Sequence, residues 1–331
     1  MKLKNAITDV PGIEVGHAQN HEALTGCTVV LCRKGAVAGV DVRGGAPGTR
    51  ETDLLDPVNM VEKAHAVVLS GGSAYGLDSA SGVMRYLEEQ NIGFNTGVAK
   101  VPIVPAAILF DLIVGASDVR PDADMGYRAA SAAATSVPPE GNVGAGTGAS
   151  VGKVLGTKTA MKAGLGTASM EANGVVVGAI VAVNSWGDVI DPKTGEILAG
   201  ARSTRLGPMK LGGDGYFANT LDMMKTLLGR TAVGVATKTN TVIGVVATNA
   251  RLTEAEATKV AQMAQDGIAR AIRPAHTMLD GDTIFALATG AKKADVSTIG
   301  AFAAEVVTEA IVRAVKKAAP AGGLPGLAGE G

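Results

Sequence analysis

The sequence contains few aromatic residues: Phe, Tyr and Trp together make up 3% of its 331 residues. Hydrophobic residues still account for 47% of the chain, so the core must be built mainly from Ala, Val, Ile and Leu. The 45 glycines allow many turns and close approaches between segments. This composition predicts sheets and helices that pack closely through small side chains.

Long apolar runs, a signal peptide and a disulfide framework are also missing. The apolar stretches Val101–Phe110 and Val175–Val183 are well short of the roughly 20 residues that a membrane-spanning helix needs. The first ten residues carry charges and lack an apolar h-region. Cys27 and Cys32 are the only cysteines, too few for a disulfide framework. We therefore expect a cytoplasmic protein with two reduced, buried thiols.

The net charge is only −1, and no basic patch with interleaved aromatic residues occurs. Neither nucleic acid nor a membrane surface is therefore expected as a partner. The Gly-x-Ser-x-Gly, His-Glu-x-x-His and Walker A motifs are missing as well. His17 and His21 come nearest to metal-ligand spacing, but their segment is not helical in pattern. We expect no metal and no cofactor.

Apolar runs bounded by turn residues predict the strands, and helical spacing predicts the helices. Strands are expected at Cys27–Cys32, Val37–Val42, His65–Leu69, Gly164–Glu171, Gly174–Asn184, Thr231–Val235, Thr241–Thr248 and Asp282–Ala288. Helices are expected to carry Leu77 to Leu87, Tyr127–Ala134, Arg251–Ile272 and Ile299–Lys316. Thr253 and Glu256 would form a capping box at the third helix. The order has no clean βαβ rhythm, which favours α/β or α+β layers over a doubly wound sheet.

Three further segments have a distinct character. Trp186–Gly213 is polar and turn-rich, which predicts an exposed excursion. The tail, residues 318–331, is rich in Gly, Pro and Ala and is expected to be disordered. The glycine loop Gly71–Gly76 fits a phosphate cradle or, better, a tight turn beside a substrate cleft. The second interpretation places Gly72, Ser73 and Tyr75 at the cleft.

A polar break, Lys238–Asn240, leads directly into the apolar strand that begins at Thr241. The local pattern alone favours an ordinary loop that enters a core strand. Nearly the whole chain, however, resembles the self-processing N-terminal-nucleophile hydrolases of peptidase family S58, the nylon-oligomer hydrolases and L-aminopeptidase/D-esterases. The blocks that carry the resemblance are Val40–Gly45, Ser70–Leu77, Val104–Asp111, Gly144–Lys153, Val183–Asn184, Asn240–Asn249 and His276–Ala286.

The resemblance implies that the chain cuts itself between Asn240 and Thr241. Fragments 1–240 and 241–331 would stay together as one hydrolase domain, an αββα sandwich of the aminopeptidase/ornithine acetyltransferase type. Such processed heterodimers usually assemble into homo-oligomers, most often tetramers. The nucleophile is serine in the aminopeptidase branch and threonine in the nylon-oligomer branch, so Thr241 points to the second.

The chemistry of an N-terminal threonine is well suited to amide hydrolysis. A threonine hydroxyl is a poor nucleophile, but a chain-terminal one carries its own base, an α-amine with a pKa of about 8. For self-cleavage, the Thr241 hydroxyl would attack the Asn240 carbonyl. The resulting ester would then be opened by water.

By resemblance, four further residues assist Thr241. Asp280 and Asp282 would support the nucleophile, and on a strand they would point to one face; alone, Asp-Gly-Asp favours a turn or a loop metal site. Lys153 matches a family lysine whose charge would lower the pKa of the α-amine, unless it is a surface lysine. Asn184 matches the oxyanion-binding asparagine, unless it only ends its strand.

Two positions leave the cleft less defined. Phe110 stands where some nylon-oligomer hydrolases carry tyrosine, so Tyr75 or a backbone N–H would have to replace the phenol donor. Trp186 follows Asn184 closely and would either line the cleft or fill a core or interface.

The resemblance implies hydrolysis of small, linear or peptide-like amides, including 6-aminohexanoate oligomers by endo-cleavage. One alternative is an aminopeptidase that releases N-terminal β- or D-residues or esters, with Asp111 as a candidate to bind the substrate amine. A second is an acyltransferase of the ornithine acetyltransferase type, in which an amine replaces water. A catalytically silent binding protein is the remaining alternative.

Overall fold

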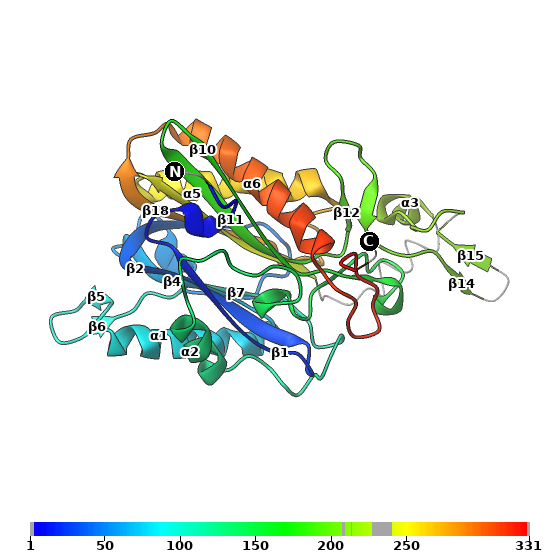
Figure 1. Ribbon diagram of the computed structural model, residues 1–331, viewed down its shortest axis with the longest axis horizontal. Helices are drawn as coiled ribbons and strands as arrows, with labels where there is room; N and C mark the ends of the chain where they lie inside the picture. Colours follow the sequence, from blue (N-terminus) through cyan, green and yellow to red (C-terminus); the bar gives the residue numbers. More distant parts are fainter. Residues whose placement is uncertain (1–2, 207–208, 213, 227–239, 330–331) are drawn as a thin grey trace.

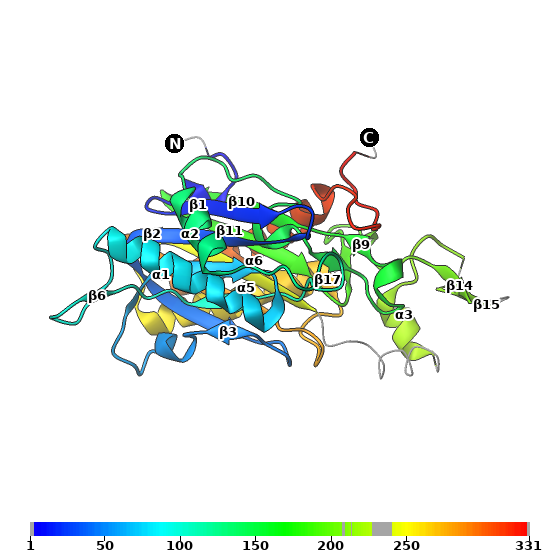
Figure 2. The ribbon, with the colours of Figure 1, turned by 90° about the horizontal axis from the view of Figure 1, so that it is seen from below.

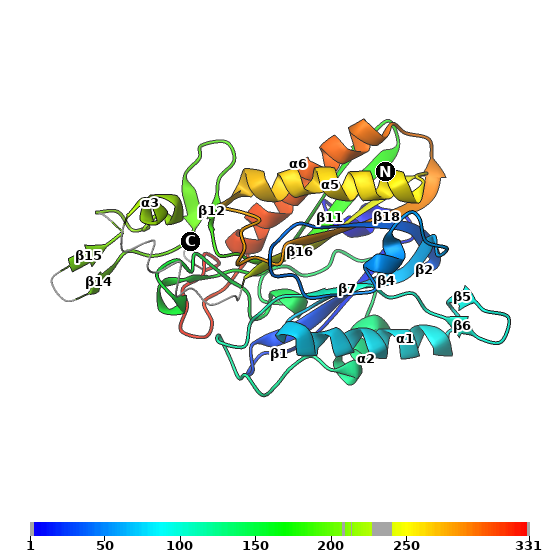
Figure 3. The same cartoon turned by 180° about the vertical axis from the view of Figure 1, so that it is seen from behind.

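The computed structural model describes residues 3–206, 209–212, 214–226 and 240–329. These residues form four layers (Figure 1). Helices α5 (Glu254–Ala271) and α6 (Val296–Lys316) cover one side of the strands, and α1 (Ser79–Glu89) and α2 (Ala123–Ser131) cover the other. The same order of layers is visible from behind in Figure 3. The expected αββα sandwich is confirmed.

The strands between the helices belong to one mixed sheet with the order β10-β11-β16-β18-β2-β4-β7-β3, and β1 pairs with β2 outside this path. Their bounds are β1 Glu14–Asn20, β2 Thr25–Val42, β3 Thr49–Arg50, β4 Lys63–Ser70, β7 Ala106–Ile108, β10 Leu165–Ala172, β11 Val175–Asn184, β16 Thr241–Ala250 and β18 Thr283–Lys292. Among these pairs, β16–β18 and β4–β7 are parallel and the rest antiparallel.

The sheet bends along strand β2, so that this one sheet forms both inner layers. Its first half pairs with β4 and its second half with β18. The register shifts between Leu31 and Ala36, where Gly35 has a φ of +73°. The two strands expected at 27–32 and 37–42 are therefore one strand. A glycine bulge between them bends the chain instead of reversing it.

Three apolar cores separate the four layers. One lies between α5, α6 and the sheet, a second between the two inner layers, and a third between the sheet, α1 and α2. Small residues allow the helices to lie close to the strands. At Gly39 a β-carbon would lie 2.3 Å from the backbone nitrogen of Thr258 in α5, and at Gly16 one would lie 2.0 Å from the Ala129 carbonyl in α2. The high glycine content thus brings helices close to strands.

Local signals fix most helix ends. At α5, Thr253 Oγ1 accepts from the Glu256 N–H at 3.3 Å and Glu256 Oε2 accepts from the Thr253 N–H at 2.7 Å, which confirms the capping box. Helix α2 begins four residues before the predicted Tyr127, because the Asp122 carboxylate caps it at Met125 N. Figure 2, which views the molecule from below, shows α1 and α2 in front of the strands. No helix in the described part of the chain has the length and apolarity needed to span a bilayer.

The two thiols lie on one strand but in different cores. Cys27 packs against the α1 and α2 side, and Cys32 lies between the inner layers, because residues five apart on a strand point to opposite faces. Both are buried and free, and burial raises the pKa of each thiol to about 12. They are inert core residues.

The segment after β11 is only partly the exposed excursion that we expected. It forms β12 (Asp188–Ile190), β13 (Ile197–Ala199), β14 (Thr204–Leu206), β15 (Met209–Leu211) and α3 (Thr220–Lys225). Strands β14 and β15 and helix α3 project from the body (Figure 1). Its base is buried: the Asp188 carboxylate accepts from Ala201 N at 2.9 Å and Thr220 N at 2.6 Å. The strand expected at 231–235 lies outside the described residues.

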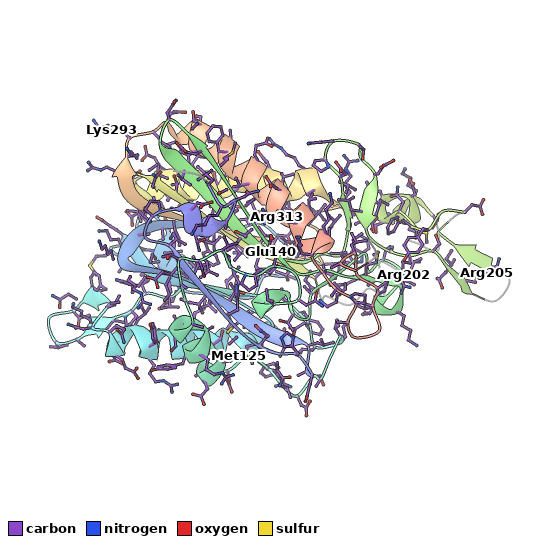
Figure 4. The ribbon with its side chains drawn as sticks, viewed as in Figure 1. Met125, Glu140, Arg202, Arg205, Lys293 and Arg313 are labelled. Atoms are coloured by element: carbon purple, nitrogen blue, oxygen red, sulfur yellow. The ribbon has the colours of Figure 1, made fainter. Side chains whose placement is uncertain are left out.

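Two segments near the C-terminus, helix α6 and the tail that follows it, are bound to the rest of the molecule. Arg313 of α6 forms a two-pronged ion pair with Glu140, with Nε at 2.9 Å and Nη2 at 2.6 Å from the carboxylate (Figure 4). Part of the tail, which was expected to be disordered, packs against the body, whereas Gly329 is exposed. Leu324 is buried and the Pro325 carbonyl accepts from Lys162 N at 2.7 Å. Specific backbone hydrogen bonds thus order a segment whose composition is typical of disordered chain.

Candidate active site

Thr241 is the first residue of β16 and is 3% exposed. Antiparallel β11 ends beside it, so that Asn184 is its register partner, and parallel β18 begins next to it after Asp280 and Asp282. In Figure 3 this end of β16 faces the side of the body from which β14, β15 and α3 project. The sheet topology alone therefore gathers residues from three distant parts of the sequence.

The carbonyl of Asn240 receives two donors. The Thr241 hydroxyl donates to it in a very short hydrogen bond, and the backbone N–H of Gly281 donates at 3.0 Å. The Thr241 hydroxyl is thereby held against the carbonyl of the peptide bond that precedes it. A backbone N–H in this position also stabilises negative charge that develops on the oxygen.

Asp282 fixes the start of β16. Its Oδ1 accepts from the Val242 N–H at 2.8 Å, and its Oδ2 accepts from both the backbone N–H and the ring Nδ1 of His276, at 3.0 and 2.9 Å. Asp282 precedes β18 instead of lying within it, since the strand begins one residue later than predicted. Its carboxylate holds the backbone next to Thr241, while the Thr241 hydroxyl is bonded to Asn240.

Asp280 lies across Gly281 from Asp282 and is buried. Its carboxylate accepts from Trp186 N at 3.3 Å and Thr277 N at 3.1 Å. Burial, together with the negative charge of Asp282, raises the pKa of Asp280 to about 6. This carboxyl therefore changes its protonation state just below neutral pH. The two acids flank Gly281 in a loop, so the expected shared strand face does not apply to them.

Lys153 and Asn184 form a second group beside Thr241. Lys153 Nζ donates to Asn184 Oδ1 at 2.7 Å and to the Asn184 backbone carbonyl at 3.1 Å. Burial lowers the pKa of Lys153 to about 7, while Asp280 and Asp111 act in the opposite direction. Lys153 is thus no surface lysine. The Asn184 amide donates one N–H to the Phe110 carbonyl at 2.9 Å, and the Gly281 N–H donates to the Asn240 carbonyl at 3.0 Å.

The residues expected at the cleft divide into buried and exposed ones. Gly72 is buried, and Ser73 has a left-handed φ of +56°. Tyr75 is 61% exposed, with the Arg120 guanidinium 3.8 Å from its ring centre. The indole of Trp186 is buried in a core, and this residue meets Asp280 through its backbone N–H. Phe110 is half-buried.

Asp111 is not available to bind a substrate amine. It is buried, and its carboxylate accepts from Thr25 Oγ1 at 2.8 Å and from Gly72 N at 2.7 Å. Burial raises its pKa, and these hydrogen bonds act in the opposite direction. Asp111 therefore holds the glycine turn in place.

Several groups at the site were not singled out from the sequence. His276 and the Gly281 N–H lie in a block that carries the family resemblance, as does Ser150, whose N–H donates to Asn184 Oδ1 at 3.1 Å. Position in such a block was the only signal for them. Lys162, fully buried nearby, lies outside every block, so nothing in the sequence marked it.

An αββα sandwich with a buried threonine hydroxyl against the preceding carbonyl defines a hydrolase of the N-terminal-nucleophile type. The chain belongs to peptidase family S58, whose model matches residues 5–328. The expected family and the expected amide-bond hydrolase are both confirmed.

Relatives of two kinds are similar over almost the full length. An uncharacterized aminopeptidase of Mycobacterium tuberculosis is 44% identical, covering 97% of this chain and 96% of that protein. A 6-aminohexanoate-oligomer endohydrolase of a Kocuria species is 31% identical, covering 93% of this chain and 85% of that protein.

Solved structures show the same fold. An L-aminopeptidase D-Ala-esterase/amidase from Ochrobactrum anthropi matches with a TM-score of 0.69 at 20% identity, over 95% of this chain and 86% of that one. A Burkholderia β-aminopeptidase matches with a TM-score of 0.66 at 24% identity, over 98% of this chain and 90% of that one.

Proposed function

We propose that this chain cleaves itself between Asn240 and Thr241 and then hydrolyses amides with the freed threonine. The observation that carries the proposal is the Asn240 carbonyl, which is held between the Thr241 hydroxyl and the Gly281 N–H. The hydroxyl oxygen attacks this carbonyl carbon, and the carbon–nitrogen bond breaks as the nitrogen takes up a proton. Water then opens the ester, leaving the Asn240 carboxylate and a free α-amine on Thr241.

The surrounding residues receive roles in the same reaction. The α-amine acts as the base for its own hydroxyl, because its pKa of about 8 suits neutral pH. Lys153, when protonated, lowers that pKa, and Asp282 keeps the first peptide of β16 in place. Gly281 N–H and the Asn184 amide are the donors that we assign to the substrate oxyanion.

We propose an aminopeptidase as the activity of the mature enzyme. Proteins named aminopeptidases reach 44% identity, whereas the oligomer endohydrolases reach 31%, so the comparisons favour this alternative over the nylon-oligomer interpretation. Endo-cleavage of 6-aminohexanoate oligomers is the second candidate. It is supported by these 31% relatives and by the threonine at position 241.

A substrate panel separates the two candidates. The mature enzyme is given an aminoacyl anilide, the same compound with an acetylated amine, and 6-aminohexanoate oligomers with free and blocked ends. An aminopeptidase cleaves the free-amine anilide at least tenfold faster than the acetylated one. Equal rates on free and blocked oligomers would instead favour the endohydrolase. Added ornithine that captures the acyl group would indicate a transferase.

We also propose that the processed heterodimers assemble into a homotetramer, as the family resemblance implies. Light scattering on the purified protein would then give about four times the chain mass of 33.1 kDa. A mass of one or two chains would contradict the tetramer and leave the proposed chemistry intact.

A further inference from the structure

A second lysine beside the site is completely buried. Lys162 is 0% exposed and lies in β9 (Met161–Lys162), which pairs with β8 (Ser150–Val151) so that Lys162 is directly opposite Ser150. Lysine is almost never fully buried unless its charge is matched. The proposed reaction gives this residue no role, so its burial needs another explanation.

Three backbone carbonyls converge on the Lys162 ammonium. Nζ donates to Ala149 O and Ala163 O, each at 2.8 Å, and to Gly146 O at 3.3 Å. Three acceptors match the three N–H donors of a protonated amine. Burial lowers the pKa of Lys162 to about 7, and the negative charge of Asp111 acts in the opposite direction. The arrangement resembles a cation site that the chain fills with its own side chain.

The carbonyls belong largely to one loop, residues 146–149, which is held from two sides. Lys162 binds the carbonyls of Gly146 and Ala149. Asp111 packs against Gly148 between them, where a β-carbon would lie 2.5 Å from Asp111 Cβ. These contacts on both sides restrict the conformations that the loop can adopt.

The loop leads directly into the active site. Its next residue, Ser150, donates its N–H to Asn184 Oδ1 at 3.1 Å, and Lys153 donates to the same oxygen at 2.7 Å. Asn184 is in turn the register partner of Thr241. A shift of the loop would therefore move two of the donors that orient Asn184 beside the nucleophile.

We propose that Lys162 is a positioning residue, a built-in cation that holds loop 146–150 so that Ser150 and Lys153 converge on Asn184. The positive charge is required, since an apolar side chain of the same length would leave the Ala163 carbonyl without its donor and would leave Gly146 O and Ala149 O with only the backbone N–H groups of Ala149 and Ala163, at 3.2 and 3.0 Å. This inference rests on the proposed self-cleavage. It extends that proposal to a residue that does not touch the reacting atoms.

The test compares the rate of fragment formation in Lys162→Met, which keeps the volume and removes the charge, with that in the exposed control Lys158→Met. We expect Lys162→Met to cleave at least 100-fold more slowly and Lys158→Met to match the wild type. Cleavage of Lys162→Met at the wild-type rate overturns the inference. A wild-type chain that never cleaves would contradict the proposed function itself, which keeps the two failures distinct.

Chemical rescue separates charge from volume. Lys162→Ala removes three carbons and the nitrogen, which propylammonium can replace, whereas propanol offers the same shape without the charge. We expect propylammonium to raise the cleavage rate of Lys162→Ala at least tenfold and propanol to have no effect. If the variant does not fold alone, refolding with each compound gives the answer. Recovery with propanol as well, or with neither compound, overturns the inference.

Discussion

The backbone N–H of Gly281 lies 3.0 Å from the carbonyl oxygen of Asn240, the residue immediately before Thr241. The two segments meet because Asn240 and Asp280 form a parallel bridge just ahead of the parallel pair β16 and β18. A feature of the sheet thus supplies the donor that the proposed cleavage requires.

Gly281→Ala should slow self-cleavage by about 100-fold, because small displacements of reacting groups have effects of this size. The added β-carbon would lie 2.6 Å from the Ala46 carbonyl and 2.9 Å from Thr241 Oγ1. A gel time course on freshly synthesised precursor measures the rate. Gly215→Ala is the control, since its nearest contact is 3.8 Å away. A Gly281→Ala chain that matures as fast as this control would show that the contact is unimportant.

Asp280→Asn should stabilise the fold at pH 7 while impairing activity. The folded-state pKa of Asp280 is raised from 3.8 to about 6, so at pH 7 its ionisation opposes folding. The substitution should raise the free energy of unfolding by about 1–3 kcal/mol at pH 7. This gain in the free energy of unfolding should shrink as the pH falls from 6 to 4, because Asp280 of the folded wild type becomes protonated in that range.

Urea unfolding of both chains in a Thr241→Ala background measures this effect without interference from processing. Thr241→Ala itself, carrying the native Asp280, is the reference. A lower free energy of unfolding for Asp280→Asn at pH 7 would mean that the ionised carboxylate stabilises the site.

Lys153→Gln should shift the pH dependence of turnover. A protonated Lys153 disfavours a second positive charge on the Thr241 α-amine, so its removal raises the pKa of that amine. The acidic limb of kcat/KM should then move to higher pH by roughly one unit. The measurement is kcat/KM from pH 5 to 9 on mature enzyme. If the acidic limb stayed at the same pH, Lys153 would not be the group that lowers the pKa of the α-amine.

Asp282→Ala should harm both stability and maturation more than Asp282→Asn does. The alanine leaves the buried Val242 N–H without its acceptor at 2.8 Å, a loss of about 1–3 kcal/mol, whereas asparagine retains an acceptor oxygen. Thermal unfolding and the maturation rate should both rank wild type above Asn and Asn above Ala. Equal behaviour of the two variants would show that the acceptor is dispensable.

Sequence patterns predicted the features that depend on neighbouring residues. The Thr253–Glu256 capping box and most core strands are such features, since their signals lie within a few positions. The bend of β2 escaped prediction because a glycine bulge and a glycine turn look alike locally. Thr241 itself stood out only through the resemblance of the whole chain.

The site contains groups that no side-chain pattern can reveal. The Gly281 N–H is a backbone donor and acquires its role only through the pairing of β16 and β18. Lys162 looks like any lysine next to a methionine, and only the folded loop brings the carbonyls of Gly146 and Ala149 to it. Tertiary geometry supplied both.

Mass spectrometry of the purified wild-type protein, compared with Thr241→Ala, tests the central proposal most directly. We predict that the wild type yields two fragments, residues 1–240 and a second that begins with Thr241 and ends at residue 331. Thr241→Ala should remain a single chain of 33.1 kDa without activity. A wild-type chain that stays intact and still hydrolyses amides, or an active Thr241→Ala variant, would contradict the account.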